Sequence, residues 1–436
     1  MLLGGEARAP ALVDRDEVWS YERLALAAEA AGAEMRAAGR LGFLFCRVDA
    51  ATVVRWVGAI ESGCAVALFD AALDRSARDA LIDRYQPDWI AGLDAGFERR
   101  ISTSNGDVHP ELALLLSTSG TTGSPKLVRL ARTAVEHNAR AIAQALAITP
   151  EQRAIASLPF HYSYGLSVLD SHLVAGASIA LVSDGMTSEG FWRTVRDARC
   201  TSMAGVPYSY QMLRRLDLEK LDVPSLRTLT QAGGRLDPRL VAHFADVQAR
   251  RGGELYVMYG QTEATARIAV MPPSELREHL DAVGRAVPGG ALSSVDGEIV
   301  YRGPNVMMGY ATERAELARG DDLGGELATG DLGRVDESGL LYVTGRSRRI
   351  AKVFGLRVNL EELEGLARAH GPAAAIAGDD HVIVYCEAAP DADLAPRRAE
   401  LAARLGVHPS GLVFRAIEQL PLAASGKIDY ARLSSR

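Results

Sequence analysis

The chain has 436 residues, 48% of them hydrophobic and 24% charged, so it can bury a large core and more than one domain. Its formal net charge is −7, and Lys and Arg are scattered along it, which gives no electrostatic support for a nucleic-acid partner. The four cysteines lie far apart without a CxxC pair, which favours reduced structural thiols in a cytoplasmic protein over a metal site.

Helical and strand patterns alternate over the first 93 residues. Apolar residues at helical spacing predict a helix over residues 21–39, with Ser20 as its cap. Buried strands are expected in LGFLFC, CAVALFD and DWIAGL, and helices in the intervening ATVVRWVGAIESG and ARDALIDRYQ. This alternation predicts an α/β fold with doubly wound sheets.

Further along, residues 114–128 form an apolar strand pattern that ends in STSGTTGSPK. Small residues let backbone N–H groups approach phosphate oxygens, hydroxyls donate further hydrogen bonds, and the lysine adds positive charge. A flexible Ser/Gly linker is the alternative, but such a linker would rarely follow a buried strand directly. The segment therefore predicts a polyphosphate site formed by Thr118, Ser119, Gly120, Thr121, Thr122, Gly123 and Lys126.

This loop is not the GxxxxGK[ST] loop of P-loop nucleotidases. Lys126 follows a proline, and no Ser or Thr follows the lysine, which disfavours a P-loop kinase or ATPase.

The most apolar internal stretch, residues 166–183, does not predict a membrane span. Asp170 and His172 interrupt it, and both would be costly in lipid. The N-terminal residues also lack the pattern of a signal peptide. The sequence gives no indication of the oligomeric state.

The character of the sequence changes after about residue 345. A basic patch, GRSRRIAK, comes before the strand patterns HVIVYCEA and GLVFRAI, which an Ala/Arg-rich helical pattern separates. We therefore expect a domain boundary here. The predicted domains are a large core of mixed sheets over residues 1–347 and a small, mobile α+β domain over residues 348–436.

Eight motifs in a common order resemble those of the adenylate-forming superfamily of acyl-CoA synthetases, peptide-synthetase adenylation domains and luciferases. After STSGTTGSPK come LPFHYSYGL (158–166), QAGGRL (231–236), YGQTEA (259–264), GEIVYRGPNVMMGY (297–310), TGDLG (329–333), GRSRRIAK (345–352) and SGKID (425–429). Any one of these strings could arise by chance, but eight in register make coincidence improbable.

The resemblance implies an AMP-forming acid–thiol ligase. Such an enzyme activates a carboxylic acid with MgATP as an acyl-adenylate and then passes the acyl group to a thiol. Coenzyme A, or the phosphopantetheine of a separate carrier protein, would be the acceptor.

The resemblance also implies roles in nucleotide binding. Glu263 is the implied Mg²⁺ ligand, since hard Mg²⁺ prefers carboxylate oxygens, and Thr262 is a phosphate contact. The Tyr259 ring is expected to stack on adenine. Asp331 has two acceptor oxygens that match the ribose diol, with Arg346 as a second ribose or phosphate contact. The same motifs add Gly233, Gly234, Arg235, Gly260 and Gln261.

Lys427 in SGKID corresponds to the catalytic lysine of the family, which bridges the acyl carboxylate and the α-phosphate. GRSRRIAK resembles the hinge about which the small domain rotates, with Arg348 where many members have Asp. Gly355 is implied to leave space for the pantetheine arm. Leu127 stands where the family usually has Gly. Each of these interpretations has an alternative. GRSRRIAK could be a solvated basic face, Lys427 a solvated side chain, and Gly233–Gly234 a simple turn.

The acyl site is implied by LPFHYSYGL. His161 takes the catalytic gate position, and Tyr162, Tyr164, Val206 and Gly233 complete the expected pocket. The motif lacks the Asp that amino-acid adenylating domains carry for the α-ammonium group, which favours an aryl, short-chain or fatty acid. For Asp170, further along, a buried hydrogen-bond network is as plausible as a substrate contact, and no role is predicted.

Two alternatives to thiol transfer by a ligase remain open. The same adenylation machinery would serve an amide synthetase that uses an amine acceptor. A degenerate nucleotide-binding subunit is the non-enzymatic alternative. The sequence disfavours that subunit because it retains four charged residues that a protein without catalytic activity would not need. These are Lys126, Glu263, Asp331 and Lys427.

Overall fold

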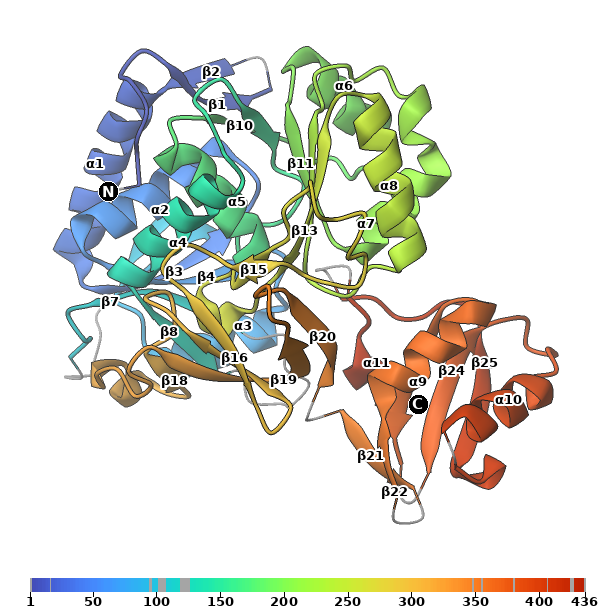
Figure 1. Ribbon diagram of the computed structural model, residues 1–436. Helices are drawn as coiled ribbons and strands as arrows, with labels where there is room; N and C mark the ends of the chain where they lie inside the picture. The colour runs from blue at the N-terminus through green and yellow to red at the C-terminus, as the bar shows by residue number, and fades with distance from the viewer. Residues whose placement is uncertain are drawn as a thin grey trace. The chain divides into compact units, whose positions relative to one another are not determined.

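The computed structural model divides into two compact units, which are described separately (Figure 1). The first comprises Met1–Ala291 and Tyr301–Leu327, and the second comprises Leu292–Val300 and Ala328–Arg436. The predicted boundary between residues 347 and 348 stays a prediction. The structure describes residues 2–15, 17–93, 96–100, 107–117, 126–346, 349–353, 356–378, 381–405, 407–423 and 427–434.

The first unit contains a seven-stranded sheet with the order β18-β8-β7-β4-β3-β5-β6. The central strands β7, β4, β3 and β5 are parallel, whereas β6, β8 and β18 pair antiparallel. β3 and β4 are buried along almost their whole length, as expected for parallel strands covered on both faces. The strands are β3 (Leu41–Cys46), β4 (Ala65–Asp70), β5 (Trp89–Leu93), β6 (Gly96–Arg99), β7 (Leu112–Ser117), β8 (Leu127–Ala131) and β18 (Gly309–Ala311).

A nine-stranded sheet in the same unit has the order β15-β14-β13-β12-β11-β9-β10-β1-β2. Its strands from β13 to β1 are parallel, so β11, β12 and β13 end at the same edge, where open α/β sheets bind ligands. The strands are β1 (Pro10–Asp14), β2 (Glu17–Ser20), β9 (Arg153–Ile155), β10 (Ser178–Leu181), β11 (Ser202–Gly205), β12 (Thr228–Gln231), β13 (Glu254–Tyr259), β14 (Ala269–Val270) and β15 (Arg285–Ala286).

Helices cover both sheets, with α4 and α5 on one side of β11 and β13 and α7 and α8 on the other (Figure 1). The first helix begins as predicted, because the Ser20 hydroxyl accepts a hydrogen bond from the Arg23 N–H at 3.1 Å. The helices are α1 (Tyr21–Ala38), α2 (Ala50–Ser62), α3 (Arg75–Tyr85), α4 (Arg132–Ala145), α5 (Ser163–Val174), α6 (Glu189–Asp197), α7 (Pro207–Leu216) and α8 (Pro238–Arg250). None of the helices in the described ranges is long and apolar enough to cross a bilayer.

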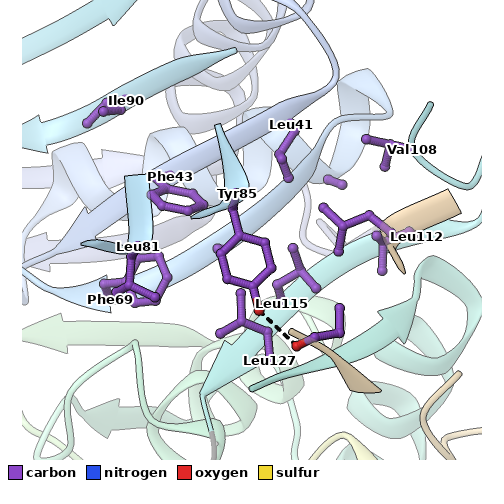
Figure 2. Close-up of a cluster of buried hydrophobic side chains, with 14 of the residues drawn as sticks. Leu41, Phe43, Phe69, Leu81, Tyr85, Ile90, Val108, Leu112, Leu115 and Leu127 are labelled. Carbon is purple, nitrogen blue, oxygen red and sulfur yellow. Dashed lines mark hydrogen bonds between the residues drawn. The ribbon is translucent and has the colours of Figure 1, made fainter. Parts of the chain in front are cut away.

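An aromatic cluster fills the core between α3 and the seven-stranded sheet (Figure 2). The rings of Phe43 and Phe69 meet edge to face with centroids 4.9 Å apart, a favourable geometry. The buried Tyr85 hydroxyl donates to the Ala311 carbonyl at 2.8 Å, which ties α3 to β18. Leu127 is fully buried in this cluster, so the residue that replaces the usual Gly serves as a core side chain at the start of β8.

The second unit holds most of a four-stranded sheet, a β-hairpin and a three-stranded sheet. The two predicted C-terminal strands are present as β24 and β25, which are parallel and joined through α10. The strands are β16 (Ala291–Val295), β17 (Glu298–Arg302), β19 (Glu326–Val335), β20 (Leu341–Arg346), β21 (Ile350–Val353), β22 (Leu356–Asn359), β23 (Ala373–Ala377), β24 (Val382–Glu387) and β25 (Leu412–Ile417), and the helices are α9 (Leu360–Ala367), α10 (Ala395–Leu405) and α11 (Tyr430–Ser434).

A buried ion pair ties these C-terminal elements together. The Glu364 side chain on α9 is 1% exposed and lies 2.7 Å from Arg349 Nη2, and the Tyr430 hydroxyl at the start of α11 donates to both its oxygens. The carboxylate is therefore well satisfied, and the chain just after the predicted hinge is anchored to both helices.

Candidate functional site

The predicted phosphate loop is bounded by two paired strands. β7 ends at Ser117 and β8 begins at Leu127, and these two residues lie opposite each other. The loop residues Thr118, Ser119, Gly120, Thr121, Thr122 and Gly123 lie outside the described part of the chain, so their roles stay predictions.

Lys126, the last residue of this loop, and Glu263 both contact Tyr310. Lys126 Nζ lies 3.6 Å from the centroid of the Tyr310 ring, where the ring quadrupole attracts a cation. The Tyr310 hydroxyl donates to Glu263 Oε1 at 2.9 Å. The structure thus brings the lysine of the loop and the expected magnesium ligand to one place, through a tyrosine for which the sequence predicted no role.

Glu263 suits a Mg²⁺ ion that is bound together with phosphate. Within the described ranges no three His, Cys, Asp or Glu side chains gather as the ligands of a metal ion. Mg²⁺ usually keeps several waters and binds through one or two carboxylates plus substrate phosphates, so one carboxylate beside a phosphate loop is sufficient.

The turn that carries Glu263 is held close to β13. A Cβ built on Gly260 would overlap the Ala266 carbonyl oxygen, so a glycine is required there for the chain to fold back. The Ile268 N–H then donates to the Tyr259 carbonyl at 2.9 Å. The Gln261 carbonyl accepts from the Ala264 N–H at 3.0 Å, which closes the turn.

At the start of α5, Ser163 Oγ lies 3.2 Å from Thr262 Oγ1. The motifs LPFHYSYGL and YGQTEA therefore meet in space, although they lie about a hundred residues apart in the sequence.

The glycines of QAGGRL form a turn at the same sheet edge. Gly233 has a φ of +80°, which favours glycine, and Gln231 Nε2 donates to the Gly234 carbonyl at 2.7 Å. Arg235 points to solvent and pairs with Asp281 at 3.1 Å. The turn is thus present, and the predicted nucleotide contacts of Gly233, Gly234 and Arg235 stay predictions.

His161 lies near a carboxylate that the sequence analysis did not single out. His161 Nε2 is 4.0 Å from Asp70 Oδ2 at the end of β4, and its Nδ1 is buried and has no hydrogen-bond partner among the residues that the structure describes. Burial lowers the pKa of His161, and Asp70 opposes that shift. A buried imidazole with a free ring nitrogen can exchange a proton with a bound group, which is compatible with the predicted gate role.

Three of the residues predicted for the acyl pocket belong to one apolar cluster. Tyr164 is buried, and its hydroxyl contacts Thr230 at the carbonyl oxygen (2.9 Å) and at Oγ1 (2.8 Å). The Tyr162 ring meets the Tyr164 ring edge to face at 6.3 Å, and Val206 packs in the same cluster. The structure therefore brings Tyr162, Tyr164 and Val206 together beside β11 and β12.

A narrow pocket lies between the nine-stranded sheet and the helices α4 and α5, and Tyr164 and Arg267 are among the residues that line it. His172 also lines the pocket; its Nδ1 lies 2.8 Å from the Val168 carbonyl and its Nε2 lies 3.2 Å from Ser202 Oγ. Burial lowers the pKa of His172 to about 4, so the imidazole is neutral near pH 7.

Asp170 does not line this pocket. It accepts a hydrogen bond from Trp56 Nε1 on α2 at 2.7 Å. Of the two interpretations left open by the sequence, this contact favours the buried hydrogen-bond network.

Five further predicted residues belong to the second unit, and the structure describes three of them. Asp331 on β19 is buried and lies opposite Arg346 on β20, so the two predicted ribose contacts occupy neighbouring strands. The Lys427 carbonyl accepts from the Ala423 N–H at 2.8 Å. Arg348 and Gly355 lie outside the described residues, and their hinge and acceptor roles stay predictions.

Residues 98–311 match the family model of AMP-binding enzymes. The matched segment is just under half of the chain and resembles members of this family. The adenylate-forming resemblance of the motifs is therefore confirmed, and five of those motifs, the phosphate loop included, lie inside the matched segment.

Two curated relatives show how this chain compares with named proteins. It is 32% identical over 282 residues to medium-chain fatty-acid–CoA ligase of Escherichia coli (strain K12), covering 62% of this chain and 48% of the relative. It is 29% identical over 344 residues to sulfoacetate–CoA ligase of Cupriavidus necator, covering 74% and 66%. The matched part of the chain spans about half the length of the first curated relatives.

Among solved structures, the chain resembles o-succinylbenzoate CoA synthetase from Bacillus subtilis in complex with an acyl-adenylate intermediate. The TM-score is 0.80 at 23% identity, over 97% of this chain and 94% of the other. This likeness confirms the predicted α/β fold class.

Besides Asp70, the sequence analysis missed two residues of this chain. Tyr310 ends the motif GEIVYRGPNVMMGY, and its position in that string was the available signal. Arg267 is a cation that precedes the apolar IAVM, which is an unusual place for a charge and indicates burial.

Proposed function

We propose that the protein is an AMP-forming carboxylic acid ligase that transfers the activated acyl group to the thiol of coenzyme A. The observation that carries this proposal is the meeting of Lys126, Tyr310 and Glu263 at the end of the phosphate loop. A carboxylate that attacks a triphosphate brings two anions together, so positive charge and a metal-binding carboxylate are required at one place.

In the first half-reaction, a carboxylate oxygen of the acid attacks the α-phosphorus of ATP, and pyrophosphate leaves. The loop and Lys126 hold the phosphates, and Thr262 adds a hydroxyl contact. Mg²⁺, held by Glu263, would supply charge neutralisation on the phosphates. Lys427 bridges the acid and the α-phosphate. The expected nucleoside contacts are Tyr259, Gly233, Gly234, Asp331 and Arg346.

In the second half-reaction, the thiol sulfur attacks the acyl carbonyl, and AMP leaves. Residues 348–436 rotate about Arg348 between the two steps, and Gly355 leaves space for the pantetheine arm. Coenzyme A is favoured as acceptor because the relatives reported above are named as CoA ligases or CoA synthetases. A carrier protein or an amine acceptor would use the same first half-reaction. A cytoplasmic location belongs to the proposal, since the four cysteines are unpaired thiols.

ATP–pyrophosphate exchange with a panel of aryl, fatty and short-chain acids tests the first step. Lys427→Ala is expected to lower the exchange rate by about 10²–10³, as for other charge-stabilising donors, while ATP binding measured by calorimetry persists. Lys220→Ala is the control, because Lys220 is 81% exposed and pairs only with Asp217 among the described residues.

Unchanged exchange in Lys427→Ala would show that this lysine is not catalytic. Exchange with no acid at all would favour the non-catalytic nucleotide-binding subunit. Coenzyme A, a phosphopantetheinylated carrier protein and hydroxylamine, supplied separately, would distinguish the three acceptors by the product formed.

A further inference from the structure

Arg267 differs from the other buried arginines of the described chain. Three arginines are buried: Arg129, Arg267 and Arg314. Arg129 lies 2.6 Å from Asp322, and Arg314 lies 3.0 Å from Asp88. Arg267 is 2% exposed, forms no ion pair with any residue that the structure describes, and has a buried Nε without a hydrogen-bond partner. A buried guanidinium is costly when no anion faces it.

The backbone of Arg267 is fixed from two sides. Its N–H donates to Asn138 Oδ1 at 3.1 Å, and its carbonyl accepts from Asn138 Nδ2 at 2.9 Å and from Asn305 Nδ2 at 3.1 Å. The guanidinium carbon lies 4.6 Å from the centroid of the Tyr164 ring. The charge is therefore held in place by contacts that leave its Nε without a partner among the described residues.

The narrow pocket lined by Arg267 offers no anion of its own. No Asp or Glu is among its described lining residues, and Arg267 is the only one of them with a buried side-chain polar atom that lacks a partner. Ser167 and Ser171 donate to backbone carbonyls, and both ring nitrogens of His172 are engaged. Burial lowers the pKa of Arg267, and only the tyrosines Tyr164 and Tyr162 oppose the shift. A guanidinium nevertheless stays charged in proteins.

The pocket also lies close to the expected site of adenylation. Glu263 and Arg267 belong to one short segment, and Ser163 contacts Thr262 immediately before Tyr164 in the chain. Glu263 and Arg267 are four residues apart, a length of chain that spans at most about 14 Å, so a short acid whose reacting carboxylate lies near Glu263 can extend toward Arg267.

We infer that Arg267 recognises a second anionic group, a carboxylate or a sulfonate, on a short acid substrate. This inference rests on the proposed function and names the substrate class of that site. The second anion supplies the partner that the folded chain does not provide, through charge-assisted hydrogen bonds that can be bidentate. An acid without that anion leaves the guanidinium unpaired, which is the strongest form of discrimination that a binding pocket offers.

Pyrophosphate exchange with matched acids tests the inference. The pairs are succinate with butyrate, phthalate with benzoate, and 3-sulfopropionate with butyrate. We expect the wild-type protein to prefer the dianionic member of each pair by about 10²-fold in kcat/KM, and Arg267→Met to lose that preference while it retains exchange with the monoanionic member. Arg267→Lys should recover part of it. Arg250→Met, at an exposed arginine paired with Glu219, is the control. An equal loss for both members of a pair, or an unchanged preference, would overturn the inference.

Thermal unfolding without ATP gives a second readout that does not depend on catalysis. Succinate, phthalate or 3-sulfopropionate should raise the Tm of the wild-type protein and not that of Arg267→Met, and the variant without ligand should be at least as stable as wild type. No increase with any of the three, together with a less stable variant, would make Arg267 a structural residue and overturn the inference. Anion-specific stabilisation without exchange for any acid would support anion recognition by Arg267 and contradict the proposed ligase function.

Discussion

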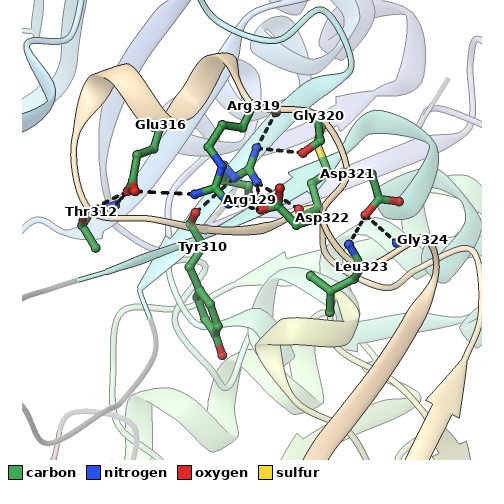
Figure 3. A network of polar contacts seen from close by, with 11 residues as sticks. Arg129, Tyr310, Thr312, Glu316, Arg319, Gly320, Asp321, Asp322, Leu323 and Gly324 are labelled. Atoms are coloured by element: carbon green, nitrogen blue, oxygen red, sulfur yellow. Dashed lines mark hydrogen bonds and ion pairs between the residues drawn. The ribbon is translucent and has the colours of Figure 1, made fainter.

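Two buried arginines of the first unit show how differently a fold can treat the same charge. Arg129 on β8 donates to the carbonyls of Met308, Tyr310, Arg319 and Gly320, and its Nη2 lies 2.6 Å from Asp322 (Figure 3). Arg267 has an equally buried guanidinium and none of these partners among the described residues. Burial alone therefore does not indicate a functional arginine. The feature that distinguishes Arg267 is burial without an anionic partner among the described residues.

The partners of Arg129 also explain what it does. They lie on β18 and in the segment that follows it, about 180–190 residues along the chain, so the guanidinium holds a distant segment against the seven-stranded sheet. The same segment carries Tyr310, which contacts Lys126 and Glu263. A structural arginine thus supports the predicted phosphate site through the segment that carries Tyr310.

Replacing Arg129 is expected to give the largest loss of stability. Arg129→Met removes the buried guanidinium that donates to Asp322 and to four backbone carbonyls, and removing one partner of a buried pair typically costs about 3–5 kcal/mol. Urea unfolding measures the change in the free energy of unfolding. Arg319→Met is the control, since Arg319 is half-exposed and contacts the same Asp322, and we expect a loss below about 1 kcal/mol. A loss below about 1 kcal/mol for Arg129→Met would show that Arg129 is not a structural residue, and the contrast with Arg267 would then fail.

Asp170 extends the comparison of buried charged groups to an acidic side chain. Its described partner is the neutral Trp56 indole. Burial raises the pKa of Asp170 to about 7 from 3.8, although the hydrogen bond from Trp56 opposes the shift. The folded state therefore keeps a proton that the unfolded state releases between about pH 4 and pH 7. The stability contributed by this group is fully present below about pH 4 and is lost as the pH rises through 7.

Asp170→Asn keeps an acceptor for Trp56 and removes the charge. Its free energy of unfolding relative to wild type should rise by about 2–3 kcal/mol between pH 5 and pH 8. His172 has the opposite linkage, since its pKa is lowered to about 4 and its contribution is lost as the pH falls. That contribution is present in both proteins and cancels in the difference. A difference that does not change with pH would show that Asp170 is ionised in the folded protein.

The sequence predicted the parts of the fold whose causes are local. The helix that begins after Ser20, the buried strands β3 and β4, and the strand before the phosphate loop all follow from periodicity, a cap or a run of apolar residues. The motifs likewise indicated Lys126 and Glu263, because each lies within a short recognisable string.

The contacts that define the chemistry of the site were not predictable in this way. Tyr310 reaches Glu263 across 47 residues, and Trp56 reaches Asp170 across 114. No short window contains both partners, so only the folded chain shows which charges are paired. For Arg267 the missing partner is the informative feature, and a sequence does not show that a contact is absent.

The smallest expected effect comes from Tyr164, whose ring lies beneath Arg267. Tyr164→Phe removes the hydroxyl that contacts Thr230 and keeps the ring, so the free energy of unfolding should fall by only about 1 kcal/mol. The preference for an acid with a second anion should change less than about threefold, since the guanidinium keeps its cation–π contact. Kinetics with succinate and butyrate measure that preference. If it disappeared in Tyr164→Phe but survived in Arg267→Met, the tyrosine hydroxyl would be the recognition group, and an unpaired buried arginine would no longer distinguish this pocket from the Arg129 network.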